Sequence, residues 1–237
     1  MPHMGNIYIP FKALFQRLNV DLVIPPVNNQ RTLSLGVRYS PEGLCIPFKL
    51  TLGNLIEAAE LGADTLIMPA GYGTCRLGYY ARTQEQILRD LGYDFEMIQI
   101  GFSEHKLFNI LRMIKRLSNN ASWYRIISAF RFGLAKLNAL DRIERVAHKV
   151  RPIERVKGTA NRLFAKAVKA IDEADDYSTL KKVQRDYIDQ LNEVPKNTKT
   201  PLIVGITGEF YVVLEPLSNL DVESELGKLG VEVRRTT

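Results

Sequence analysis

The stretch Asp64-Thr65-Leu66-Ile67-Met68-Pro69 is an apolar run that predicts a short strand buried on both faces. A glycine-rich loop follows it, then a helical pattern over about 79–91, and then a second apolar run at 95–100. A further buried strand is expected at 21–25, where two prolines stop it. Strands that alternate with helices at this spacing indicate a parallel sheet covered by helices. The sequence therefore predicts an α/β fold with a Rossmann-like parallel sheet.

Helical patterns surround and interrupt this α/β region. Helices are expected at 7–18 and 52–61, while the segment 27–49 has a loop-like composition. From 103 to 194 the apolar residues recur at helical spacing, which predicts a large helical insertion. Four helical stripes are expected there, over 107–117, 123–137, 163–171 and 180–191.

Beyond a linker at 195–201, the α/β pattern returns with a strand at 202–206, a helix at 220–229 and a strand at 231–233. We therefore expect three parts: a Rossmann-like part at 1–102, a basic helical insertion or subdomain at 103–198, and a strand-helix-strand part at 199–237. Since no closing helix follows the last strand, we also expect a clipped gene product or a fragment.

The composition of the 237 residues is that of a globular protein, with 46% hydrophobic and 24% charged residues. No apolar run reaches the length of a membrane span, and the start lacks the pattern of a signal peptide. Two cysteines are too few for a disulfide-stapled secreted fold. A cytoplasmic protein without a membrane segment is therefore expected.

Positive charge is concentrated in the helical middle of the chain. Residues 106–200 hold 21 Lys and Arg against 10 Asp and Glu, although the whole chain carries a net charge of only +6. Such a surface suits an acidic partner or the nucleotide end of a ligand, and it also suits plain solvation of helices. We do not expect nucleic acid as a partner, because no aromatic-and-basic RNA motif or zinc finger is present.

Two loops carry the candidate site residues. In the first, Gly71 and Gly73 let the backbone approach a ligand, and Cys75 and Arg76 lead into a helix. Amides at a helix N-terminus stabilise negative charge and favour a thiolate, so Cys75 suits a metal ligand or a nucleophile. The alternative is a tight turn that contains an incidental small apolar cysteine.

The second loop places Cys45 and Lys49 just before another helix. If both loops lie at one edge of the sheet, Cys45 and Cys75 converge there. Two thiolates alone complete neither a tetrahedral zinc site nor an iron–sulfur cluster, which commonly needs four cysteines. No Walker A loop, HExxH motif or full GxGxxG motif is present, and no catalytic residue is identified.

The two loops together resemble a known family. Glu42-x-x-Cys45-x-Pro47-x-Lys49, followed by Gly71-x-Gly73-x-Cys75-Arg76-x-Gly78-Tyr79-Tyr80, is similar to the 2-hydroxyacyl-CoA dehydratase component D superfamily. More narrowly, the chain resembles its branch of acyl-CoA dehydratase activase-related proteins, also called CoA-substrate-specific enzyme activases. The segments Pro2–Asn6 and Gly208–Tyr211 fit the same branch.

The resemblance implies an iron–sulfur protein that accepts low-potential electrons from an ATP-hydrolysing iron–sulfur activator. Cys45 and Cys75 would then be ligands of a [4Fe–4S] or double-cubane cluster. Lys49, Arg76 and the amides of Gly71 and Gly73 would surround it. The enzyme system would be a dehydratase-like lyase or an ATP-dependent reductase that acts on acyl-CoA.

Family members are longer and carry a further cluster cysteine, which this chain lacks. A full cluster would therefore need a second copy of the chain, a partner subunit or non-protein ligands. The alternative function is a non-catalytic binding or assembly module. Its basic helical surface would dock an acidic partner or the nucleotide end of CoA.

Overall fold

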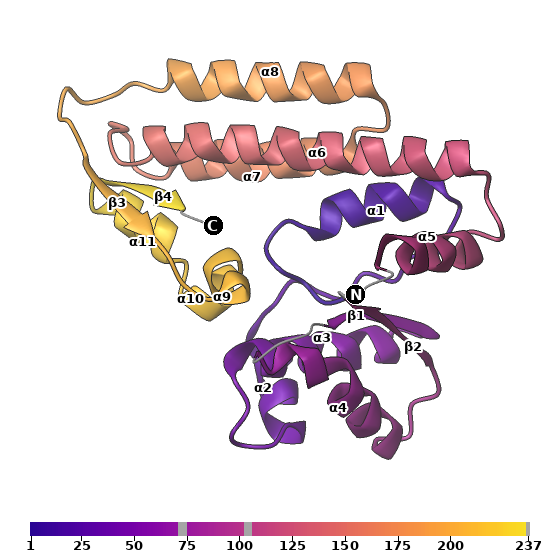
Figure 1. Cartoon of the computed structure of the whole chain (residues 1–237). Helices are drawn as coiled ribbons and strands as arrows, with labels where there is room; N and C mark the ends of the chain where they lie inside the picture. Colours follow the sequence, from indigo (N-terminus) through magenta and orange to yellow (C-terminus); the bar gives the residue numbers. More distant parts are fainter. Residues whose placement is uncertain (71–74, 102–105, 236–237) are drawn as a thin grey trace. The chain divides into compact units, whose positions relative to one another are not determined.

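The computed structural model describes residues 1–70, 75–101 and 106–235, which form two compact units (Figure 1). Unit 1 comprises Met1–Met4 and Phe15–Ile126, and unit 2 comprises Gly5–Leu14 and Ile127–Thr237. The chain changes unit within helix α1 (Tyr8–Arg17), so each unit is assembled from separated segments. The domain boundaries predicted at residues 102 and 198 stay a prediction.

Unit 1 is built on a parallel pair of strands, β1 (Thr65–Ala70) and β2 (Glu96–Gly101), with Thr65 opposite Glu96. Helices α3 (Ile46–Glu60) and α4 (Leu77–Asp90) pack with β1 in one core. The buried side chains of this core include Phe48, Leu52, Leu55, Ile56, Leu66, Met68, Tyr80 and Leu88. Both strands and the α4 helix agree with the sequence pattern.

The strand expected at 21–25 is not formed, and this prediction is wrong. Its apolar residues are only half-buried, and Pro25 and Pro26 have no N–H group to offer a neighbouring strand. The carbonyl oxygen of Pro25 instead lies 2.7 Å from the Nε2 atom of His3. The apolar run at 21–25 therefore lies in an irregular segment. At Pro25, the contact with the His3 side chain takes the place of a hydrogen bond to a neighbouring strand.

The loop expected over 27–49 contains a helix, α2 (Gln30–Tyr39), so this expectation is also wrong. Asn29 begins the helix with a capping box, because its side chain accepts from the Thr32 amide and the Thr32 hydroxyl accepts from the Asn29 amide. Helix α2 lies directly against α3, where Gly36 and Gly53 permit close approach of the two backbones. Helix α5 (Lys106–Leu117) also belongs to unit 1.

Unit 2 is mainly helical. From Ile127 onward, α6 (Trp123–Val150) packs with α7 (Thr159–Glu173) and α8 (Tyr177–Glu193) around a core that includes Ile143 and Ile171. The strands β3 (Leu202–Ile206) and β4 (Val231–Arg235) form a second parallel pair. Three short helices lie between these strands in sequence: α9 (Phe210–Leu214), α10 (Pro216–Asn219) and α11 (Val222–Lys228).

The four helical stripes predicted between 103 and 194 fall within α5, α6, α7 and α8. A Rossmann-like arrangement stays a prediction, since the described strands form two separate parallel pairs. None of the helices in the described ranges combines the length and the apolar character needed to cross a bilayer.

Candidate functional site

The first candidate site lies in unit 1, at the edge where the parallel strands β1 and β2 end. Strand β1 leads into the segment before α4, and parallel strands place their carboxyl ends at the same edge of a sheet. Cys75 and Arg76 belong to this segment, and both are exposed. The predicted site residues Gly71 and Gly73 lie outside the described residues.

Two contacts join the segment before α3 to helix α4. Cys45 is the N-cap residue of α3, and its Sγ atom hydrogen-bonds with the hydroxyl of Tyr80 on α4. Arg76, the N-cap residue of α4, donates from its guanidinium to the Gly43 carbonyl oxygen at 2.7 Å. The structure therefore brings Cys45 and Arg76 into one region, which we call the thiol edge: Gly43, Cys45, Lys49, Cys75, Arg76 and Tyr80.

The thiol edge is positively polarised. Neither Cys45 nor Arg76 makes a side-chain cap, so neither side chain offsets the positive end of its helix dipole. The amides of Phe48 and Tyr79 are bonded to the backbone, at 3.1 Å to the Cys45 carbonyl and 2.9 Å to the Arg76 carbonyl. The Lys49 ammonium donates to the Glu42 carbonyl at 3.4 Å, which places a second cation beside the first. Helix N-termini and cations both favour bound anions, so the arrangement suits a phosphate or a carboxylate. The role of Cys45 and Cys75 as metal ligands stays a prediction.

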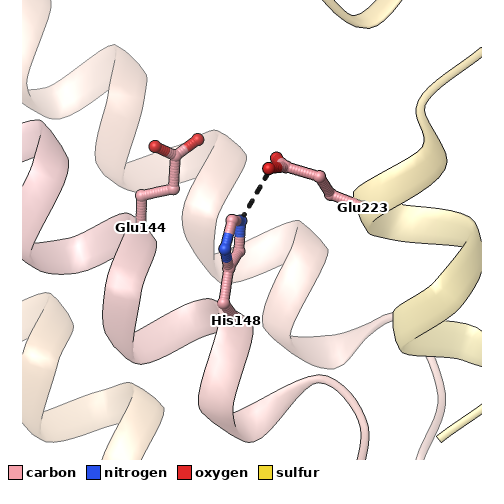
Figure 2. A group of neighbouring side chains, drawn as sticks. All are labelled: Glu144, His148 and Glu223. Carbon is pink, nitrogen blue, oxygen red and sulfur yellow. Dashed lines mark ion pairs between the residues drawn. The ribbon is translucent and has the colours of Figure 1, made fainter. Parts of the chain in front are cut away.

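A second cluster lies in unit 2, where Glu144 and His148 of α6 face Glu223 of α11 (Figure 2). Their ligand atoms lie within 4.8 Å of one another, and His148 Nε2 is 3.5 Å from a Glu223 oxygen. Arg235 of β4 binds both carboxylates, at 2.9 and 3.0 Å from the Glu144 oxygens and 2.5 Å from each Glu223 oxygen. Because one guanidinium hydrogen-bonds to both carboxylates, Arg235 links α6, α11 and β4.

This cluster was not a candidate in the sequence. Glu144 and His148 are four residues apart on a helix, a spacing that places them on one face. That spacing alone is common on helical surfaces, and Glu223 and Arg235 are remote in sequence. Only the fold brings the four residues together.

Burial lowers the pKa of His148 below its ordinary value of 6.5, and the nearby cations Arg151 and Arg235 act in the same direction. Glu144 and Glu223 oppose this effect without reversing it. Since the unfolded chain then binds a proton at higher pH than the folded chain, stability is complete above the unfolded pKa and falls as pH drops below it.

We therefore expect the free energy of unfolding to fall when the pH is lowered from about 7.5 to about 5.5. Urea unfolding followed by circular dichroism at the two pH values measures this change. The variant His148→Gln serves as the reference, because it cannot take up the proton. A pH dependence equally steep in wild type and in His148→Gln would contradict the assignment.

Comparison with known proteins finds a match to one protein family. A family model described as the CoA enzyme activase uncharacterised domain matches residues 3–236. No curated protein and no solved structure matches the chain.

The family match corrects the expected function. The prediction of an iron–sulfur protein that accepts electrons from an activator is wrong, because the match is to a domain of CoA enzyme activases. Such a domain belongs to the activator side of the system. The chain also has only two cysteines, Cys45 and Cys75. Within the described residues, the one group of three or more metal-ligating side chains is Glu144, His148 and Glu223, which contains neither cysteine.

The activase-related part of the resemblance is confirmed. The matched residues 3–236 include both units and both loops of the thiol edge. The match therefore holds for the chain as a whole and not for one segment. The chain belongs to the family of the CoA enzyme activase uncharacterised domain.

Proposed function

We propose that the chain takes part in activating a CoA-dependent enzyme and that its thiol edge binds the phosphate groups of an adenine nucleotide. CoA and ATP share this chemistry, and both fit the activase family. The observation that carries the proposal is the joining of two helix N-termini by the Arg76–Gly43 and Cys45–Tyr80 contacts.

The geometry supports an adenine nucleotide as the ligand in three ways. Helices α3 and α4 are 15 and 14 residues long, so each has a full macrodipole with its positive end at this edge. Arg76 is exposed, and its planar guanidinium can bind a phosphate through two N–H groups. Exposed Tyr79, one of the first residues of α4, offers an aromatic ring beside the same edge.

The partner in this proposal is the CoA enzyme that is activated. An acyl-CoA dehydratase is the class that the resemblance of the two loops implies. A closer relationship to the 2-hydroxyacyl-CoA dehydratase component D superfamily belongs to the same proposal. Its support is the spacing of Cys45 and Lys49 at the start of α3 and of Cys75 and Arg76 before α4.

Calorimetric titration with CoA, dephospho-CoA, pantetheine and ATP tests the proposal. The variant Arg76→Ala should raise the dissociation constant for a phosphate-bearing ligand about tenfold, because a charge-assisted hydrogen bond is worth roughly 1.5–3 kcal/mol. Pantetheine, which lacks the nucleotide, should bind no better to the wild type than to Arg76→Ala. Tighter binding of CoA than of ATP would identify CoA as the source of the phosphates, and the reverse order would identify ATP.

The matched control is Arg89→Ala, at the opposite end of the same helix, where Arg89 pairs with Glu85 at 2.9 Å. Both variants lose one positive charge from α4, but only Arg76→Ala loses it at the thiol edge. Equal weakening by the two variants would show a general charge effect and contradict the proposal. Absence of binding by CoA and by ATP to the wild type would also overturn it.

A further inference from the structure

Helix α6 carries an exposed apolar stripe within unit 2. Its members recur at intervals of three and four residues, which places them on one face of the helix. They are Ile127, Phe130, Leu134 and Leu137, with exposed fractions of 55%, 52%, 42% and 38%. The other face of α6 packs into the core through side chains such as Phe132 and Ile143, which are buried. The helix is thus apolar on two faces, and its own unit buries only one of them.

A basic edge begins beside this stripe and continues toward the C-terminal end of α6, beyond Leu137. Arg131, Arg142 and Lys149 are exposed, and the intervals of eleven and seven residues between them return to the same side of a helix. The acidic residue nearest the end of the stripe, Asp141, is paired with Arg145 at 2.8 Å. The edge therefore presents net positive charge beside the apolar stripe.

We propose that the α6 stripe binds an amphipathic helix of another protein, whose apolar face is bordered by acidic residues. Spacing by three and four residues is the pattern by which two helices pack along a common seam. Opposite charges beside such a seam select the partner, and like charges reject it. In an antiparallel pair of two copies, the basic edge of one α6 would lie beside the basic edge of the other, so the charges disfavour self-association. This inference concerns unit 2 and does not depend on nucleotide binding in unit 1.

The probe is a synthetic peptide of four heptads, with leucine along the seam and glutamate beside it, and a second peptide carries lysine in place of glutamate. Fluorescence anisotropy should show that the wild type binds the glutamate peptide and not the lysine peptide. Leu134→Ser should weaken this binding at least tenfold. Arg131→Glu combined with Arg142→Glu should abolish binding of the glutamate peptide and create binding of the lysine peptide.

The matched control is Leu229→Ser, which removes a leucine that is 80% exposed in the same unit but lies outside α6. Thermal melts by circular dichroism should show that both serine variants remain folded. The proposal is overturned if Leu134→Ser and Leu229→Ser weaken binding equally, or if neither peptide binds the wild type. It is also overturned if light scattering shows a dimer that Leu134→Ser dissociates, or if phosphatidylglycerol vesicles bind the wild type while the glutamate peptide does not.

Discussion

Replacing Arg235 by alanine is expected to cost unit 2 roughly 2–4 kcal/mol of unfolding free energy, since removal of one partner leaves the other charges buried and unpaired. The Arg235 side chain is 22% exposed, and the two carboxylates that it binds, on Glu144 and Glu223, are 20% and 12% exposed. Without the guanidinium, both acids would remain close together in this shielded place. Hydrogen exchange measured by mass spectrometry should show the loss of protection in α11 and in the second half of α6.

An ion pair that is exposed on both sides offers a matched control. Arg145 pairs with Asp141 on α6 at 2.8 Å, and their side chains are 74% and 45% exposed. Arg145→Ala should therefore cost less than about 1 kcal/mol, as exposed ion pairs do. Adding Glu144→Gln to Arg235→Ala should recover part of the lost stability, because it removes one of the two unpaired charges. Equal costs for Arg145→Ala and Arg235→Ala would show that the cluster contributes no more than a surface pair.

The second large effect is expected from adding one methyl group between α2 and α3. A Cβ atom on Gly53 would lie 2.0 Å from the Thr32 carbonyl oxygen, and one on Gly36 would lie 1.7 Å from the Lys49 carbonyl oxygen. Both obstacles are helix backbone, which cannot turn aside as a side chain can. Gly53→Ala should therefore force the helices apart and cost about 3 kcal/mol, the upper end of overpacking effects. Urea unfolding measures the loss, and hydrogen exchange should place it in unit 1.

The separation of α2 from α3 would also break polar contacts. Glu57 of α3 is 1% exposed and accepts from the Thr32 hydroxyl at 2.9 Å and from Arg31 at 3.1 Å. The matched control is Gly43→Ala, because a Cβ atom there would meet nothing within 4 Å. It should leave stability within about 0.5 kcal/mol of the wild type. If Gly53→Ala were as mild as Gly43→Ala, the close approach of α2 and α3 would be wrong.

The elements that could be predicted are those whose apolar pattern decides their structure. The runs at 64–69 and 95–100 form β1 and β2, because the two strands pair with each other and their apolar side chains pack in one core. Helix α2 is not indicated by its apolar residues, because those over 33–39 alternate with other residues and do not recur at helical spacing. The Asn29 and Thr32 capping pair is the signal that could have indicated it. The strand expected at 21–25 failed because local apolar character cannot reveal whether a neighbouring strand is available.

The residues of the candidate site could be predicted from the sequence, but the contacts between them could not. The positions of Cys45 and Arg76 before α3 and α4 followed from the sequence, because each precedes a helical pattern. The Cys45–Tyr80 contact could not be foreseen, since the partner of the Tyr80 hydroxyl depends on how α3 packs against α4. The Arg235 cluster joins elements separated by a large part of the chain, so only long-range folding could reveal it.

The division of α1 between two units has a consequence for the order of folding during synthesis. Residues 5–14 contribute Ile9 and Ala13 to the core of unit 2, whose other helices begin only with Ile127. The ribosome makes those helices on the order of 100 residues later, which takes on the order of 10 s. During that interval the early segment lacks the helices that it packs against in unit 2. The time that synthesis takes between residue 14 and the helices of unit 2 therefore decides how long Ile9 and Ala13 stay exposed and depend on chaperones.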